Sequence, residues 1–132
     1  MSSSTPYGIK VKTSLEFNEA IEAVIVALSD EGFGILTRID VKETLNAKLG
    51  VEMQPYVILG ACNPNLAHRG LQIEPDLGLL LPCNVTIMAE PEGVVVSAMN
   101  PALLAEVTEN PRMVEIADEA TERLNRALET LS

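Results

Sequence analysis

The sequence contains few of the side chains that carry thiol, imidazole and aromatic chemistry. It has two cysteines, one histidine, two tyrosines and two phenylalanines, and it has no tryptophan. Both cysteines and the histidine fall within residues 56–85, so nearly all of the thiol and soft-ligand chemistry of the chain lies in that segment. Because aromatic residues make up only 3% of the chain while 47% of it is hydrophobic, we expect a core of aliphatic side chains.

Positively charged residues are also scarce. Nine lysines and arginines stand against nineteen aspartates and glutamates, which gives a formal net charge of -10. A chain with this charge repels phosphate backbones and anionic lipid surfaces. We therefore expect neither a nucleic-acid partner nor a membrane partner.

Long apolar runs are absent from the sequence. The longest ones cover residues 23–28 and 77–81, whereas a membrane-spanning helix needs roughly 20 apolar residues. The N-terminal stretch has no basic segment followed by an apolar run, as a secretory leader would have. A length of 132 residues fits one hydrophobic core. These features predict a soluble, cytoplasmic single domain over residues 1–132, with reduced cysteines.

Five segments are predicted to form strands. Apolar and polar residues alternate over residues 7–13 and 33–41, and residues 56–62 are rich in β-forming side chains. Residues 83–90 and 94–99 are two further strands, and the Glu-Pro-Glu-Gly sequence between them indicates a hairpin.

Helices are predicted between these strands from capping patterns and apolar spacing. Thr13 with Glu16 matches a capping box, which predicts a long helix over residues 14–31. Asp40 with Glu43 repeats the pattern before a brief helix. Asn-Pro pairs at positions 63, 100 and 110 open three more helices, of which the last is long and carries one apolar stripe.

The order of these elements favours an α+β fold, in which an antiparallel or mixed sheet has its helices packed on one face. Residues 74–82, bounded by prolines, are predicted to be a connecting segment whose leucines lie against the core. Both faces of the last strand carry apolar residues, with Val95 and Met99 on one side. Either a homodimer covers this second face, or residues 101–108 or a loop of the same chain do so.

Cys62 comes directly before the helix predicted to begin at Asn63. The positive end of the helix dipole and the unpaired backbone amides at this position would stabilise a thiolate. Cys62 is therefore either a reactive or ligand-binding thiol or a small apolar side chain buried at a strand end. Cys83 opens a strand in phase with core residues, which favours core packing.

His68 lies in the middle of the helix predicted over residues 63–73. Cys62, His68 and Cys83 offer three ligands of the types that zinc uses, and a water, Asp76 or Glu74 could supply the fourth. The spacing contains no Cys-x-x-Cys pair, so a surface histidine without a ligand is the competing interpretation. No third group orients a nucleophile and base pair, and the sequence identifies neither a catalytic residue nor a cofactor.

The turn from residue 60 to residue 64 leads from a predicted strand into a helix N-terminus. Its backbone amides, with Asn63 as the capping residue, could hold an anionic group. The turn lacks the glycine pattern of a nucleotide-binding loop. We therefore place Asn63 with Cys62, His68 and Cys83 among the candidate ligand-binding residues.

The segment GACNPNLAHRGLQIEPDLGLLLPCNV resembles the signature stretch of a prokaryotic family known as domain of unknown function 302, and the resemblance spans almost the whole chain. The family has a Gly-x-Cys-Asn-Pro turn, a helix with alanine and leucine, and a Pro-x-x-Gly-x-Leu-Leu-Pro-Cys stretch. The matching residues are Gly60, Cys62, Asn63, Pro64, Ala67, Leu71, Pro75, Gly78, Leu80, Leu81, Pro82 and Cys83. Gly70 stands where the family usually has alanine, which is expected to loosen this helix and its packing.

The resemblance implies an α+β fold of the TATA-binding-protein-like type, with a curved antiparallel sheet and two long helices in the order β-α-β4-α with short helical insertions, often found as a dimer. It implies no activity. The likeness to a DNA-binding fold is an analogy of architecture, and the net charge of -10 argues against DNA binding.

Three functional hypotheses follow from these observations. The leading one is a dimeric, non-enzymatic module that binds a small molecule or a metal near the segment from Cys62 to Cys83. The first alternative is a thiol-dependent redox or metal-using enzyme in which Cys62 is the reactive group. The second is a protein interaction module without a ligand.

Overall fold

The computed structural model describes residues 2–132, so Met1, which the predicted domain includes, lies outside the described residues. Within that range, six antiparallel strands form one sheet in the order β1-β2-β6-β5-β4-β3. The strands are β1 (Ser2–Thr5), β2 (Gly8–Thr13), β3 (Gly34–Asp40), β4 (Tyr56–Cys62), β5 (Cys83–Glu90) and β6 (Gly93–Met99). The helices are α1 (Phe17–Asp30), α2 (Val41–Leu49), α3 (Pro64–Ile73), the 3-10 helix η1 (Pro75–Leu80), α4 (Ala102–Thr108) and α5 (Met113–Glu129).

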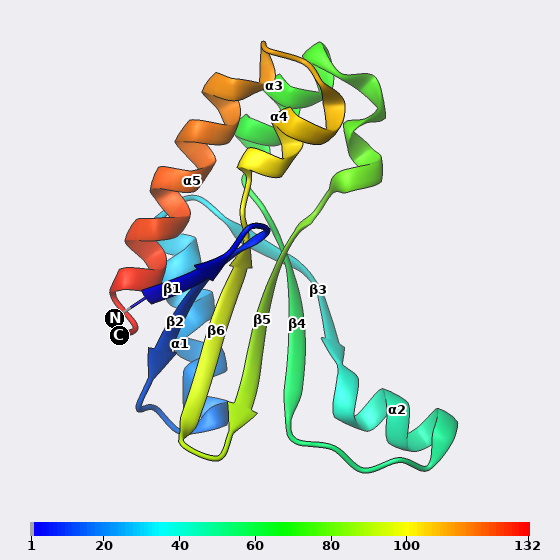
Figure 1. Ribbon diagram of the computed structural model, residues 1–132, viewed down its shortest axis with the longest axis vertical. Coiled ribbons are helices and arrows are strands. Elements are labelled where there is room, and N and C mark those ends of the chain that lie inside the picture. Colours follow the sequence, from blue (N-terminus) through cyan, green and yellow to red (C-terminus); the bar gives the residue numbers. More distant parts are fainter. Residues whose placement is uncertain (1) are drawn as a thin grey trace.

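The predicted α+β fold is confirmed, with an antiparallel sheet and the long helices α1 and α5 on one of its faces (Figure 1). The five predicted strands are all present. The short strand β1 was not predicted, because its serine-rich sequence lacks the apolar alternation typical of a strand. Antiparallel backbone pairing with β2 holds β1 at the sheet edge.

Alternation along the central strands separates a helix-covered face from an open face. Residues on the helix-covered face are buried: Val57, Leu59, Val85, Ile87, Val94 and Val96. They pack against Ile21, Val24 and Leu28 of α1 and Leu124 and Leu128 of α5. Each fully buried aliphatic side chain stabilises the fold by about 1.5–3 kcal/mol, so this aliphatic cluster is the main source of stability.

A second buried cluster lies beyond the end of the sheet. Leu66 of α3, Leu77 of η1 and Leu104 of α4 meet Met113 and Ile116 of α5 there. The N-terminal half of α5 packs in this second cluster, and its C-terminal half packs on the sheet (Figure 1). The predicted packing of the 74–82 segment against the core is confirmed at Leu77, which is buried, while the 3-10 helix η1 in this segment was not predicted.

The predicted capping box at the start of α1 is wrong. The helix begins at Phe17, and the carboxylate of Glu16 caps it by accepting a hydrogen bond from the Glu19 amide at 3.1 Å. Thr13 remains in β2, where its hydroxyl accepts a hydrogen bond from the Leu15 amide at 3.2 Å. The helix cap predicted at Asp40 is confirmed, because the Asp40 carboxylate accepts a hydrogen bond from the Glu43 amide at 2.9 Å.

The edge strand β3 does not show the burial that its alternation predicts. Its pairing with β4 is irregular between Ile35 and Thr37, and Leu36 and Ile39 are 66% and 47% exposed. The helix α2 that follows buries none of its residues and projects away from the body of the molecule (Figure 1). β3 and α2 therefore form an exposed, partly apolar arm.

The apolar residues on the open side of β6 are covered within the chain itself. Val95 is 5% exposed, and Met99 packs against the second buried cluster beside α4. One of the two predicted explanations was that residues 101–108 cover this face, and it accounts for the partial burial of Met99. The apolar character of this strand thus gives no support to a dimer on the open face.

Close packing at Gly60 of β4 gives a test of this architecture. A Cβ atom added at Gly60 would collide with the Thr37 side chain and approach Pro82 Cγ to 2.8 Å, whereas one added at Gly34 of β3 meets no atom within 4 Å. Overpacking of this kind costs about 1–3 kcal/mol. We expect Gly60→Ala to lower the free energy of unfolding by that amount in urea titrations and Gly34→Ala to leave it nearly unchanged. Equal effects would contradict the described contact of β4 with β3 and Pro82.

Candidate functional site

A small pocket lies at the junction of the two buried clusters. Phe33 and Ala61 of the first cluster line it together with Leu66, Leu77 and Ile116 of the second cluster. Its volume is about 40 Å³ and most of its lining is apolar. That volume is far below the roughly 150 Å³ of a cavity that binds benzene, so the pocket suits an ion or a few atoms.

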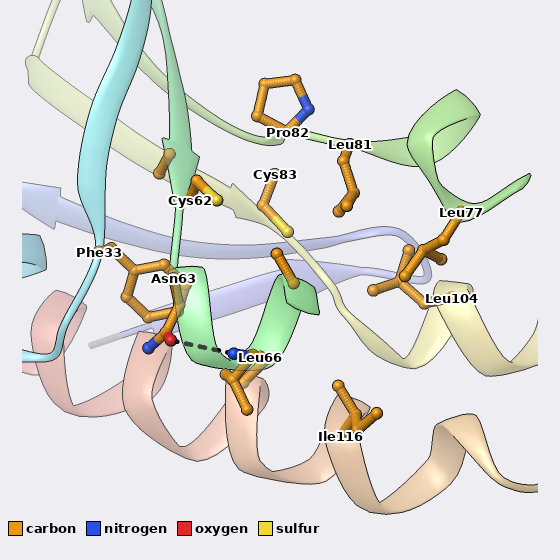
Figure 2. Close-up of a pocket in the computed structure, with 13 residues that line it drawn as sticks. Phe33, Cys62, Asn63, Leu66, Leu77, Leu81, Pro82, Cys83, Leu104 and Ile116 are labelled. Atoms are coloured by element: carbon orange, nitrogen blue, oxygen red, sulfur yellow. Dashed lines mark hydrogen bonds between the residues drawn. The ribbon is translucent and has the colours of Figure 1, made fainter. Parts of the chain in front are cut away.

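Both cysteines face this pocket. Cys62 ends β4 and Cys83 begins the neighbouring strand β5, where Ala61 is paired with Cys83. Figure 2 shows the sulfur atoms of Cys62 and Cys83 directed into the same space. Both are free thiols, with Cys62 half-buried and Cys83 buried. The antiparallel pairing of these two strand ends thus brings the two cysteines of the chain to the same pocket.

The environment of Cys83 favours its neutral form. Burial, and next the nearby Cys62, raise the pKa of the Cys83 thiol from 9.0 to about 11. A buried thiolate loses hydration that the mostly apolar lining does not replace. Cys83 is therefore protonated at neutral pH and needs a ligand or a base to release its proton.

Asn63 fixes the wall of the pocket on the α3 side. Its side-chain oxygen accepts a hydrogen bond from the Leu66 amide at 3.2 Å and so caps α3, as predicted (Figure 2). Its amide nitrogen donates to the carbonyl oxygen of Glu31 at 3.5 Å. Both polar atoms of the Asn63 side chain therefore have partners within the fold, which makes Asn63 a positioning residue at this site.

His68 does not join the cysteines. It is exposed on α3 and is not part of the pocket lining. Across residues 2–132, no group of three or more histidine, cysteine, aspartate or glutamate side chains is arranged to hold a metal ion. The predicted ligand set of Cys62, His68 and Cys83 with Asp76 or Glu74 is thus not assembled, because the pocket is on one side of α3 and His68 projects from another.

Gly70 allows the helix α3 to approach η1 closely. It is buried, and a Cβ atom there would lie 2.6 Å from Leu77 Cδ2 and 3.6 Å from Met113 Cε. The expectation that Gly70 loosens the packing is therefore wrong. The missing side chain provides the space that Leu77 occupies between α3 and α5.

Several residues of the pocket were missed by the sequence reasoning. Phe33 comes from the turn after α1, Leu104 from α4, and Ile116 and Ala120 from α5. The apolar stripe of the last helix predicts that Ala120 is buried, but it does not indicate which neighbours it meets. Leu104, Ile116 and Ala120 lie 42 to 58 positions after Cys62, and the packing of α4 and α5 brings them to the pocket.

Comparison with known proteins identifies relatives of this chain. The family model described as "Domain of unknown function DUF302" matches residues 9–131. A crystal structure of an uncharacterized conserved DUF302 protein from Bacillus stearothermophilus is similar, with 32% sequence identity and a TM-score of 0.90. The similarity covers 97% of this chain and 100% of the other. No curated protein matches the chain.

The raised pKa of Cys83 predicts a pH dependence of stability. The unfolded thiol ionises near 9.0 and the folded one near 11, so the stabilisation of the neutral thiol is present below pH 9.0 and is lost as pH rises through 11. Between pH 8 and pH 11, we expect the protein to lose about 2 kcal/mol more unfolding free energy than Cys83→Ala, measured by urea titration. Parallel losses in the two proteins would contradict the burial of this thiol.

Proposed function

The chain belongs to the DUF302 family, and on this premise we propose that it is a single-domain, non-enzymatic binding module whose Cys62 and Cys83 hold a soft, thiophilic metal ion such as Cu(I). The observation that carries the proposal is that both thiols of the chain face one small, mostly apolar pocket. Thiolates select soft cations, whereas carboxylates and water select hard ones.

The size and the ligand count of the pocket both favour a monovalent soft ion. A volume of about 40 Å³ accommodates an ion and excludes most metabolites. Structural zinc requires four protein ligands, and no third histidine, cysteine, aspartate or glutamate joins the two cysteines among residues 2–132. Cu(I) is stable with two thiolate ligands, so the pair of cysteines suffices for it.

Binding of the ion requires the loss of both thiol protons. One Cu(I) and two thiols give two Cu–S bonds and two protons released to water, and the complex carries one negative charge. The N-terminus of α3, which follows Cys62 directly, favours negative charge at this place. Because Cys83 holds its proton up to a pKa of about 11, affinity should rise with pH.

Competition with a chromogenic Cu(I) chelator under anaerobic conditions tests the proposal. We expect one Cu(I) per chain, and Cys62→Ser and Cys83→Ser should each weaken its affinity by at least about 100-fold, since each removes one of two ligands. His68→Ala is the matched control, because His68 is exposed on α3, the helix that follows Cys62, and lies outside the pocket; this variant should bind Cu(I) as the parent does.

Two results would contradict the metal proposal. One is the absence of chelator-competitive Cu(I) binding by the folded parent protein. The other is retention of the parent affinity in both cysteine variants, with folding verified by circular dichroism. Native mass spectrometry with Ag(I), which has the same ligand preference, provides a second readout of stoichiometry.

A thiol-redox role is the second candidate, and the shared pocket of the two cysteines favours it as well. In this reaction the Cys62 thiolate attacks a disulfide oxidant such as oxidised glutathione and releases one glutathione. The Cys83 thiol then displaces the second glutathione to give a Cys62–Cys83 disulfide, with two glutathiones formed for two thiols oxidised. Formation of this disulfide by a protein that takes up no Cu(I) would favour the redox role.

The arm formed by β3 and α2 supports the further proposal that the module is a homodimer. Leu36, Ile39 and Leu49 of this arm, and Val51 just after it, are 43% to 69% exposed, and α2 buries none of its residues. Exposed apolar side chains beside a free strand edge are typical of surfaces that pair with another chain. A second copy packed on the arm would bury them. In the alternative, the chain is an interaction module and a different protein packs on this arm.

Solution mass tests the dimer. We expect light scattering to give about twice the chain mass of 14.2 kDa and Leu36→Lys with Leu49→Lys to shift it to the monomer, because the charges would be buried at the interface. Leu79→Lys on η1 is the matched control, since Leu79 is 86% exposed and lies outside the arm. A monomeric parent at high concentration, or a control that dissociates equally, would contradict this arrangement.

A further inference from the structure

The sheet face that carries no long helix holds a second, larger hollow. This open-face groove has a volume of about 350 Å³ and is lined in part by Lys10 of β2, Ser97 of β6, Thr86 of β5 and Tyr56 of β4. The same face of the sheet is turned toward the viewer in Figure 1, with α1 behind it. Sites for small molecules start at about 300 Å³, so the groove has the size of a ligand site and the cysteine pocket does not.

The strand register places a cation and two hydroxyls in one row across the groove. Lys10 is paired with Ser97, and Ser97 is paired with Thr86 on its other side. Side chains directly opposite each other on antiparallel strands lie on the same face and within reach of one another. The row therefore places an ammonium group and two hydroxyl groups side by side along the groove.

Ser97 is the polar group that the fold leaves without a partner. Its hydroxyl oxygen is buried and makes no hydrogen bond with any of the residues that the structure describes. It interrupts a strand whose preceding residues are Val94, Val95 and Val96. Buried polar groups in folded proteins nearly always have a partner, so an unpaired hydroxyl in a groove points to a ligand.

Charge in the groove is opposite to that of the whole chain. Lys10 is the single charged side chain among the described residues that line it, in a protein of net charge -10. Lys10 is half-buried and takes part in none of the ion pairs formed within residues 2–132. An ammonium group that is partly desolvated and has no carboxylate partner is complementary to an anion.

Most of the remaining lining is apolar, although Thr5 and Asn84 also belong to it. Both tyrosines of the chain, Tyr7 and Tyr56, border the groove, and Met88 and Met99 line it as well. Aromatic rings and the flexible thioethers of methionine pack well against planar ligands. The polar row and this apolar surface together match a molecule with one acidic group and one ring system.

We propose that the open-face groove binds a small aromatic carboxylate, with its carboxylate at Lys10 and Ser97 and its ring against Tyr56 and Met88. This site is separate from the cysteine pocket, because it lies on the opposite face of the sheet. Its occupancy does not depend on Cys62 or Cys83.

A pair of probes that differ only in charge tests the proposal. 2-Naphthoate and its neutral amide 2-naphthamide have the same ring, and their dissociation constants can be measured by two-dimensional NMR titration. We expect naphthoate to bind at least about tenfold more tightly than naphthamide, which is the contribution of one charge-assisted hydrogen bond. Amide signals of β2, β5 and β6 should move, and Cys62→Ser/Cys83→Ser should give the same constants as the parent.

Lys10→Met and Lys12→Met form the matched pair of variants. Lys12 is on the same strand and face but is exposed and outside the groove lining, so Lys12→Met should keep the preference for naphthoate. Lys10→Met should abolish it, and Lys10→Gln serves if the first variant misfolds. The proposal is overturned if naphthoate moves no signal at millimolar concentration, if both probes bind equally, or if Lys10→Met retains the preference.

Discussion

The end of α1 at Glu31 is the junction on which the arrangement of the two buried clusters depends. The Glu31 carbonyl oxygen accepts hydrogen bonds from Asn63 at 3.5 Å and from Arg123 at 3.2 Å, and its carboxylate accepts two from Arg126. Gly32 follows in a left-handed conformation, and a Cβ atom there would come within 2.9 Å of the Asn63 amide nitrogen. One residue thus fixes the end of α1, the cap of α3 and the C-terminal half of α5 relative to each other.

The polar contacts of Glu31 fix the relative positions of α1, α3 and α5, but they contribute little to the free energy of folding. The ion pairs of Glu31 are partly exposed, and pairs of this kind contribute little free energy in water. The hydrogen bond from Arg126 lowers the pKa of the Glu31 carboxyl, so the junction keeps its charge over the neutral pH range. Burial of aliphatic side chains in the two clusters supplies the main favourable free energy. The cysteine pocket is the space that remains where these clusters meet.

Local signals in the sequence were sufficient for the architecture and for part of the site. Alternation and β-forming composition predicted five of the six strands described within residues 2–132, and Asn63, directly after Cys62, was correctly identified as a helix cap. His68 was grouped with Cys62 because the two are six positions apart in the sequence, but His68 is exposed on α3 and lies away from the cysteines. The bonds between Glu31 and Arg126 join residues 95 positions apart, and no local pattern predicts such a pair. The exposure of β3 was missed because its pairing with β4 is irregular.

Along β5, the two-residue period of a strand directs successive residues to the two proposed sites. Cys83 faces the helix-covered side and the cysteine pocket, while the next residue, Asn84, faces the open-face groove. Ala61 and Tyr56 of β4 divide between the two sites in the same way. A shift of one residue in register would exchange the sides and place the cysteine on the open face. The pairing of β4 with β5 therefore maintains both sites at once, although no side chain that lines one of them lines the other.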